Sequence, residues 1–127
     1  MSVQMSNEKT FEAAADLSSY QYCFVIANGT GSANNKKVTY GTADSLALGI
    51  LQNAPDASGK AAEVAITGTC KLKVSAEVAF GAKLSSGSTG QGETTSGTAS
   101  FYRAIALEYG AAGQIIEVLL CTGELTA

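Results

Sequence analysis

Few residues in this sequence could do chemistry. There is no histidine among the 127 residues, so the chain lacks the side chain that most often acts as a general base near neutral pH and that binds zinc most often. Serine–histidine and cysteine–histidine nucleophile pairs are excluded for the same reason. The composition therefore argues against an enzyme, and we expect no catalytic residue, no cofactor and no metal.

The three cysteines, Cys23, Cys70 and Cys121, lie in apolar stretches that resemble strands. An odd number of cysteines in a chain of this size does not indicate a disulfide framework. The first residues show neither the basic nor the apolar region of a signal peptide. We therefore expect a protein made in a reducing cytoplasm, with the cysteines as small core residues rather than redox or metal groups.

Glu63 and Glu117 could form a pair of carboxylates for acid and base catalysis. They occupy matching places in an internal echo, A-S-G-K-A-A-E-V-A-I over residues 57–66 and A-A-G-Q-I-I-E-V-L-L over residues 111–120. Their neighbours are small or aliphatic and could not position a substrate, which favours solvated or interface glutamates on strands. The echo indicates two related hairpins, unless it is a chance similarity between segments rich in small residues.

The charge balance bears on the binding partners. Eight lysines and arginines stand against eleven acidic residues, and the only arginine is Arg103. No basic stripe is available to contact phosphates, so we expect no nucleic acid partner. No apolar run approaches the roughly 20 residues of a membrane-spanning helix, so we expect no membrane association.

Hydrophobic periodicity favours strands along most of the chain. Cys70, Leu72 and Val74 alternate with polar residues, the period of two that places apolar side chains on one face of a strand. Turn-forming residues separate further stretches of this kind, which are residues 20–27, 38–40, 46–52, 61–67, 101–107 and 114–121. The sequence predicts an all-β fold, a compact β-sandwich or small β-barrel-like domain with an extended N-terminal arm.

The expected organisation is an arm over residues 1–10 and one β domain with a single core over residues 11–127. Residues 8–17 could instead form a helix, because they contain an alanine run that Asn7 could cap. Otherwise they are extended, with a tight turn at residues 16–19. Residues 85–100 are almost entirely Ser, Thr and Gly, which predicts a flexible hairpin tip or surface loop.

The last predicted strand has two apolar faces. The set that alternates on one face as ordinary core is Ile116, Val118 and Leu120. The other face carries Ile115, Leu119 and Cys121 together with Glu117. Because a small domain buries one face of each sheet, we expect Ile115, Glu117 and Leu119 to form a subunit interface, unless the N-terminal arm covers them.

Three segments in this order resemble the small capsid decoration (cement) proteins of tailed bacteriophages. They are D-L-S-S-Y-Q-Y-C-F-V at residues 16–25, G-I-L-Q-N-A-P-D-A-S-G-K-A-A-E-V-A-I-T-G at residues 49–68 and A-I-A-L-E-Y-G-A-A-G-Q-I-I-E-V-L-L at residues 104–120. The resemblance implies a compact β domain, commonly a homotrimer, on the outside of the virion's capsid. There it would bridge major capsid proteins and stabilise the head, after synthesis in the host cytoplasm.

The N-terminal arm has too few apolar residues to fold alone, so we expect a partner to order it. Val3 and Met5, followed by Phe11, are the predicted capsid-binding residues of the arm. The alternative function is a head-fibre base or a carbohydrate-binding adhesion module on the virion. Sugar-binding modules present aromatic platforms, whereas this chain is 7% aromatic and has no tryptophan.

Overall fold

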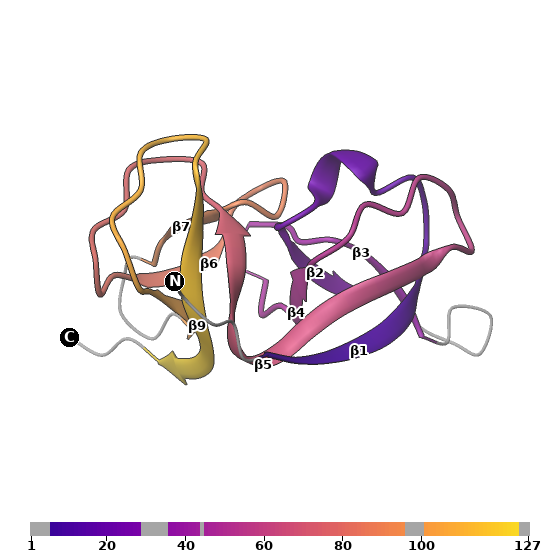
Figure 1. The fold of residues 1–127 in the computed structure, drawn as a ribbon, viewed down its shortest axis with the longest axis horizontal. Helices are drawn as coiled ribbons and strands as arrows, with labels where there is room; N and C mark the ends of the chain where they lie inside the picture. The colour runs from indigo at the N-terminus through magenta and orange to yellow at the C-terminus, as the bar shows by residue number, and fades with distance from the viewer. Residues whose placement is uncertain (1–5, 29–35, 44, 96–100, 125–127) are drawn as a thin grey trace.

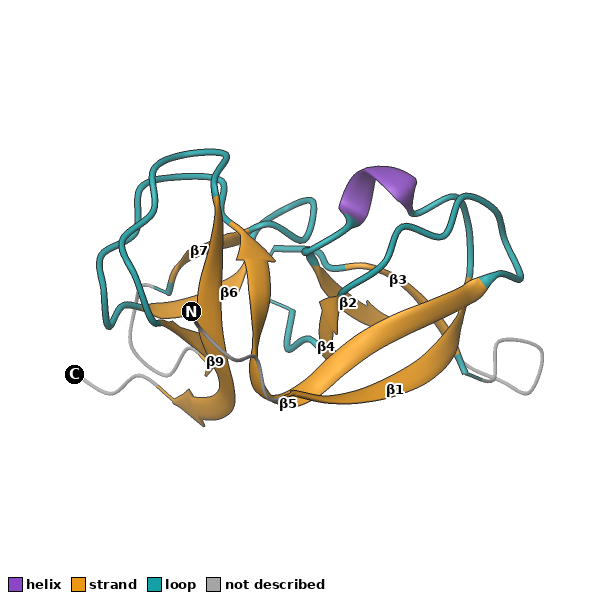
Figure 2. Cartoon of the chain, in the orientation of Figure 1, coloured by secondary structure: helices purple, strands orange, loops and turns teal. Residues whose placement is uncertain are grey.

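The computed structural model describes residues 6–28, 36–43, 45–95 and 101–124. Strands dominate these residues, and the helical element among them is one short 3-10 turn (Figures 1 and 2). The all-β expectation is confirmed. The elements are β1 Ser6–Ala13, η1 Ser18–Tyr20, β2 Phe24–Ala27, β3 Lys37–Tyr40, β4 Gly49–Leu51, β5 Ala61–Lys73, β6 Lys83–Ser86, β7 Gly92–Thr94, β8 Phe101–Ala106 and β9 Ile115–Glu124.

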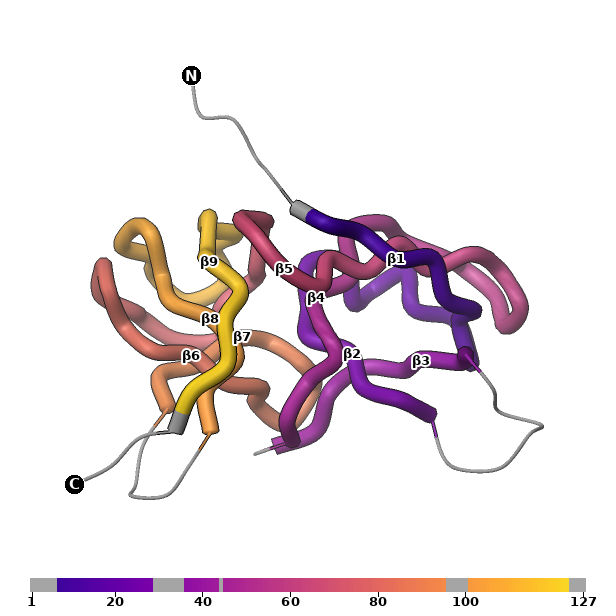
Figure 3. The backbone as a smooth tube through the Cα atoms, turned by 90° about the horizontal axis from the view of Figure 1, so that it is seen from below, coloured from indigo at the N-terminus to yellow at the C-terminus, as the bar shows by residue number. Residues whose placement is uncertain are grey.

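The strands form two small barrels that share β5. The sheet order is β1-β3-β2-β4-β5-β9-β8-β6-β7, and an additional β1–β5 pairing closes the first five strands into a ring. In the second ring, a parallel bridge between Val74 and Gly92 brings β7 back to the end of β5. Figure 3 shows β6 to β9 on one side and β1 to β3 on the other, with β4 and β5 between. The expected single domain is therefore built as two barrels.

The buried apolar residues accordingly form two clusters instead of the single core expected. The cluster inside the first barrel contains Ala13, Leu17, Val25, Val38, Leu51, Ala62 and Val64. The larger cluster fills the second barrel and extends into the junction between the barrels, with the members Phe24, Ala47, Ile50, Ala65, Cys70, Leu72, Val74, Val78, Leu84, Ala104, Ala106, Ile116, Val118 and Leu120.

Strand β5 runs through both barrels. Its first part pairs with β1 and β4, and its second part pairs with β9. The partner changes at Gly68, which pairs with Ser6 and with Leu120 and has φ +88°. This left-handed conformation suits glycine, and Figure 1 shows β5 bending sharply between the two bodies. The two strand-like stretches on either side of Gly68 are thus one strand of 13 residues.

The two barrels have the same strand pairings. Glu12 pairs with Ala61 in the first barrel as Lys73 pairs with Ile115 in the second. The next pairs, Phe11 with Ala62 and Leu72 with Ile116, keep the same register. The internal echo is therefore part of a repeat that covers both barrels. The predicted related hairpins are the antiparallel pairs β4–β5 and β8–β9.

The backbone conformations repeat as well. The residues with positive φ fall into equivalent pairs, which are Tyr22 with Gly81, Lys36 with Gly90 and Gly59 with Gly113. The hydrogen bonds around them match: Tyr22 N donates to Leu51 O at 2.6 Å, and Gly81 N donates to Ala106 O at 2.8 Å. Gly68 at the junction has no such counterpart among the described residues.

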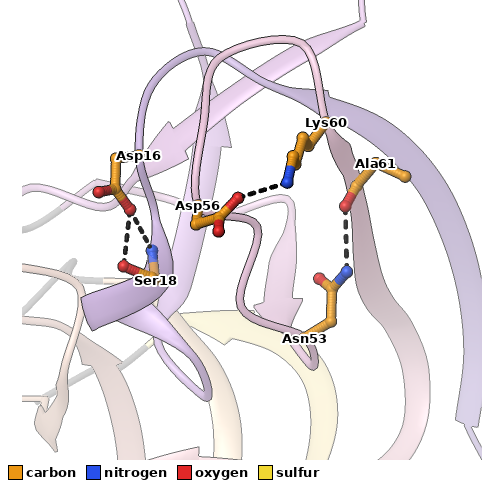
Figure 4. Close-up of polar contacts among 6 residues, drawn as sticks. All are labelled: Asp16, Ser18, Asn53, Asp56, Lys60 and Ala61. Atoms are coloured by element: carbon orange, nitrogen blue, oxygen red, sulfur yellow. Dashed lines mark hydrogen bonds and ion pairs between the residues drawn. The ribbon is translucent and has the colours of Figure 1, made fainter.

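Residues 6–10, expected in a free arm, belong to β1 and pair with β5 from Ser6–Gly68 to Thr10–Glu63. The helix considered over residues 8–17 is wrong, because pairing with β5 and β3 outweighs the helix propensity of the alanine run. The tight turn is confirmed. The Ser18 N–H and hydroxyl donate to Asp16 Oδ1 at 2.9 and 2.6 Å (Figure 4), and these bonds lower the pKa of Asp16.

The loop expected over residues 85–100 is ordered in its first part. β6 and β7 form an antiparallel hairpin, with Ser86 opposite Gly92. Ser85, Ser86 and Thr95 are buried, since serine and threonine side chains are small and the hairpin pairs their backbone. Gly92 lies against the Leu72 side chain, which leaves no room for a Cβ. Residues 96–100 lie outside the described residues.

Arg103 of β8 forms hydrogen bonds from the second barrel to the first. Its Nε donates to Ala47 O at 3.1 Å, and its Nη2 donates to Leu48 O at 2.9 Å and to Ile66 O at 2.7 Å. The residue is buried, and burial lowers the pKa of the guanidinium, which still stays protonated. All three of these acceptors are backbone carbonyls.

We expect Arg103→Met to lower the free energy of unfolding by roughly 2–4 kcal/mol, because it leaves buried carbonyls without their charged donor. Arg103→Lys should recover only part of the loss, since one ammonium cannot span all these acceptors. Lys9→Met, which removes an exposed cation from β1, is the control and should change stability by about 0.5 kcal/mol or less. Urea unfolding measures the three variants. Wild-type stability of Arg103→Met would contradict this role.

We also expect Gly59→Ala and Gly113→Ala to cost similar amounts, about 1 kcal/mol each, because an L side chain is strained at positive φ. Neither added methyl would meet an atom within 4 Å, so conformation alone sets the cost. Ser58→Ala in the same loop is the control, with little expected change. Thermal unfolding tests the equivalence of the hairpins, and a loss at one glycine without a loss at the other would reject it.

Candidate interaction surface

The cysteines are placed largely as expected for core residues. Cys23 and Cys70 are buried, and burial raises the pKa of the Cys23 thiol to about 11 and that of the Cys70 thiol to about 12. Both are therefore protonated near neutral pH and are poor nucleophiles. Cys121 on β9 is only partly buried. Within the described ranges, no three potential metal ligands are grouped, and no helix is long and apolar enough to cross a membrane.

Glu63 and Glu117 occupy equivalent places in the two barrels. Glu63 Oε1 accepts a hydrogen bond from Thr10 Oγ1 at 2.8 Å on the neighbouring β1. Glu117 lies opposite Lys71 across the β5–β9 pair. Each glutamate thus faces a residue of the neighbouring strand in its own barrel. The geometry fits strand glutamates better than a shared catalytic site.

Local polar contacts hold the loop before β5, and Figure 4 shows the Asn53–Ala61 and Asp56–Lys60 contacts among them. The Asn53 side chain donates to Ala61 O at 3.0 Å and accepts from Glu63 N at 3.0 Å. Asp56 and Lys60 form an exposed ion pair at 2.7 Å, which lowers the pKa of Asp56 and raises that of Lys60. These contacts shape the loop, and every polar group named is satisfied within it.

The outer face of β9 presents apolar side chains, as its alternation predicted. Ile115 is 48% exposed and Leu119 is 37% exposed, whereas the alternate residues Ile116, Val118 and Leu120 are buried. Glu117, between them on the outer face, is partly buried. The structure thus places all three predicted interface residues on one surface strand.

Leu119 belongs to a row of side chains that crosses three strands. It lies opposite Ile105 on β8, and Ile105 lies opposite Lys83 on β6. We call these residues the outer row. The Lys83 ammonium stands 5.6 Å from the centre of the Tyr102 ring at one end of the row. Ile105 and Lys83 could not be recognised from the sequence as neighbours of Leu119, because only strand pairing brings them together.

The outer row borders the junction between the barrels. Arg103, on the same strand as Ile105, reaches the Leu48 carbonyl of the first barrel. Leu48 and Leu46 keep exposed side chains there. Arg103 therefore connects the strand of Ile105 to a segment with exposed leucine side chains.

A second exposed group lies in the loops of the second barrel. Phe80 is 73% exposed, and Tyr109 is also exposed. The Tyr109 hydroxyl donates to Glu77 Oε2 at 2.7 Å, which raises the pKa of Tyr109. Backbone bonds between Val78 and Gly110 hold the two loops together. This aromatic group was not anticipated, because each ring stands alone in its stretch of sequence.

Of the three predicted capsid-binding residues of the arm, the structure describes Phe11. Val3 and Met5 lie outside the described residues. Phe11 lies opposite Ala62 in the β1–β5 pair, and its partly buried ring packs against the core of the first barrel. Its packing is thus accounted for within the chain.

Comparison with solved structures finds a likeness in fold. No family model matches the chain, and no curated protein matches it. Among solved structures, the fold is similar to the N base of the head fibre protein gp8.5 from bacteriophage phi29, with a TM-score of 0.74 and 14% sequence identity. The likeness covers 97% of this chain and 100% of that one, so it includes both barrels. The chain therefore shares the fold of a phage head fibre base.

Proposed function

We propose that the chain is a structural protein of a phage head, seated on the outside of the capsid and bound to the major capsid protein. The observation that carries the proposal is the fold likeness to a head fibre base over nearly the whole length of both chains. The resemblance of three sequence segments to capsid decoration proteins points independently to the same location. The exposed groups of the barrels, aliphatic and aromatic, suit contacts with protein surfaces.

Two roles are compatible with this location. A cement protein bridges neighbouring capsid subunits and strengthens the shell, which is the role that the sequence resemblance implies. A fibre base anchors an appendage and need not strengthen the shell, and the likeness to the phi29 protein favours this second candidate. The two roles differ in one measurable property, the stability of the decorated shell.

We expect the purified protein to co-sediment with expanded empty heads of the phage that encodes it, and to saturate them. With occupancy confirmed, a higher rupture temperature of decorated heads would identify a cement protein. Unchanged rupture at full occupancy would identify a fibre base. Heads of an unrelated phage are the control and measure nonspecific co-sedimentation. The proposal of a head protein fails if the folded protein binds the heads of its own phage no better than this control.

Testing the predicted capsid contact of the N-terminal arm requires a deletion that is shorter than the whole arm. Deleting residues 2–5 leaves β1 intact and should preserve the melting temperature while weakening binding to heads. Deleting residues 2–9 also removes pairs between β1 and β5 and should lower the melting temperature. Undiminished head occupancy after the shorter deletion would show that the arm does not contact the capsid.

The exposed rings of Phe80 and Tyr109 make a carbohydrate-binding role testable. A glycan array probed with the folded protein, beside a Phe80→Ala variant, separates this role from a purely structural one. Binding that the substitution abolishes would assign adhesion to the second barrel. We expect no binding by either protein.

A further inference from the structure

The second barrel contains a short segment of the first at its seam, the place where β7 returns to the end of β5. Lys73 N, at the end of β5, donates to Tyr22 O at 2.7 Å. Phe24 N donates at the same distance to Gly90 O, in the loop before β7, and Figure 1 shows this loop reaching toward the first barrel. Residues 22–24, which we call the inserted segment, therefore join two strand ends of the second barrel.

The second barrel has its own copy of the inserted segment, residues 81–83, which we call the outer segment. Both segments begin with a residue of positive φ. At their ends, Lys83 O accepts from Thr95 N at 2.8 Å, as Phe24 O accepts from Gly41 N at 2.8 Å. The outer segment therefore has the backbone course with which the inserted segment binds a seam.

The two segments differ in what covers them. Phe24 of the inserted segment is buried, whereas Gly81 and Lys83 of the outer segment are exposed. The N–H and C=O of a strand residue point to the same side, so Lys83 N faces away from β8, toward Thr95. Within the described ranges, neither Gly81 O nor Lys83 N has a backbone partner. These are the groups whose counterparts bind the seam at the junction.

A buried hydroxyl beside the outer segment is also unpaired. Thr95 is 8% exposed, and its hydroxyl has no hydrogen-bond partner in the part of the chain that the structure describes. At the equivalent Gly41, the Ser86 hydroxyl of the second barrel lies so close that a Cβ would not fit. Because buried polar groups are rarely left without a partner, the Thr95 hydroxyl points to a further chain at this place.

A second copy of this chain does not offer a free seam. Its first barrel is closed by the bond from Glu12 N to Lys36 O at 2.8 Å, and its second seam already binds its own inserted segment. The occupant therefore belongs to a different protein. An extended segment that presents one N–H and one C=O fits, as in the pairing of a strand with an exposed sheet edge.

We infer that an extended segment of the major capsid protein pairs with the outer segment. Its backbone bonds to Gly81 O and Lys83 N, and it passes the Thr95 hydroxyl. The inference rests on the proposed head function, which makes the capsid the partner, and it adds the site and the mode of contact. Because the contacts are to the main chain, they do not need the Lys83 side chain.

Saturation co-sedimentation with expanded empty heads tests the contact with two variants of one position. Lys83→Pro removes the N–H and should weaken head binding about 10-fold or more, because a capsid carbonyl loses its donor. Lys83→Ala keeps the N–H and is the matched control, with binding within about threefold of wild type. Circular dichroism and the melting temperature establish that each variant is folded.

Thr95→Val replaces Lys83→Pro if the proline variant does not fold. Removing an unpaired buried hydroxyl should leave the melting temperature of the free protein unchanged or higher. Head binding should nevertheless weaken several-fold, because the hydroxyl is lost from the contact. A purely structural threonine would leave head binding unchanged, which would contradict the inference.

Hydrogen exchange gives a readout that needs no substitution. The Lys83 amide should exchange at least about 10-fold more slowly on heads than in the free protein. Protection that rises with the concentration of the free protein would identify a second copy as the occupant and overturn the inference. Wild-type protein that does not bind heads would remove the proposed function and this contact together. Folded Lys83→Pro that binds like Lys83→Ala, or a Lys83 amide that stays unprotected on occupied heads, would overturn this contact alone.

Discussion

Strand β5 belongs to both barrels, and this shared strand constrains how every other strand is placed. Its 13 residues supply a wall to each barrel, and Gly68 turns the strand where its partner changes from β1 to β9. A shift of β5 by one residue against its partner strands would turn its apolar side chains from the inside to the outside of both barrels. The register of one barrel is therefore tied to that of the other. Arg103 then fixes the angle between the barrels by binding carbonyls across the junction.

Sharing a strand also explains how so small a chain is stable with few charges and many small residues. Each barrel corresponds to about half of the 127 residues, and domains of roughly 60 residues bury too little surface to be more than marginally stable. Packing Phe24, Ile50 and Ala65 against the second barrel adds apolar burial that an isolated barrel would lack. The shared strand and this packing join the two barrels into one body.

Local patterns in the sequence predicted much of the fold. Alternation identified the outer face of β9, Asp16 and Ser18 identified a turn, and the echo identified the β4–β5 and β8–β9 hairpins. The extended alternative for residues 8–13 was right, but the pairing of β1 with β5 could not be predicted, because the two strands are distant in the sequence. The β6–β7 hairpin was expected as a flexible loop, because its Ser, Thr and Gly residues carry no strand pattern. Arg103 could not be recognised either, since its ligands are main-chain carbonyls that leave no trace in the residue types.

The two barrels should unfold as a single cooperative unit, which differential scanning calorimetry can measure. Because β5 belongs to both barrels and Arg103 of the second barrel binds the first, we expect one unfolding transition. Its calorimetric and van't Hoff enthalpies should agree when both are analysed for the oligomeric state of the sample. Two resolved transitions, or a calorimetric enthalpy well above the van't Hoff value, would show that the barrels unfold separately and would contradict the claim.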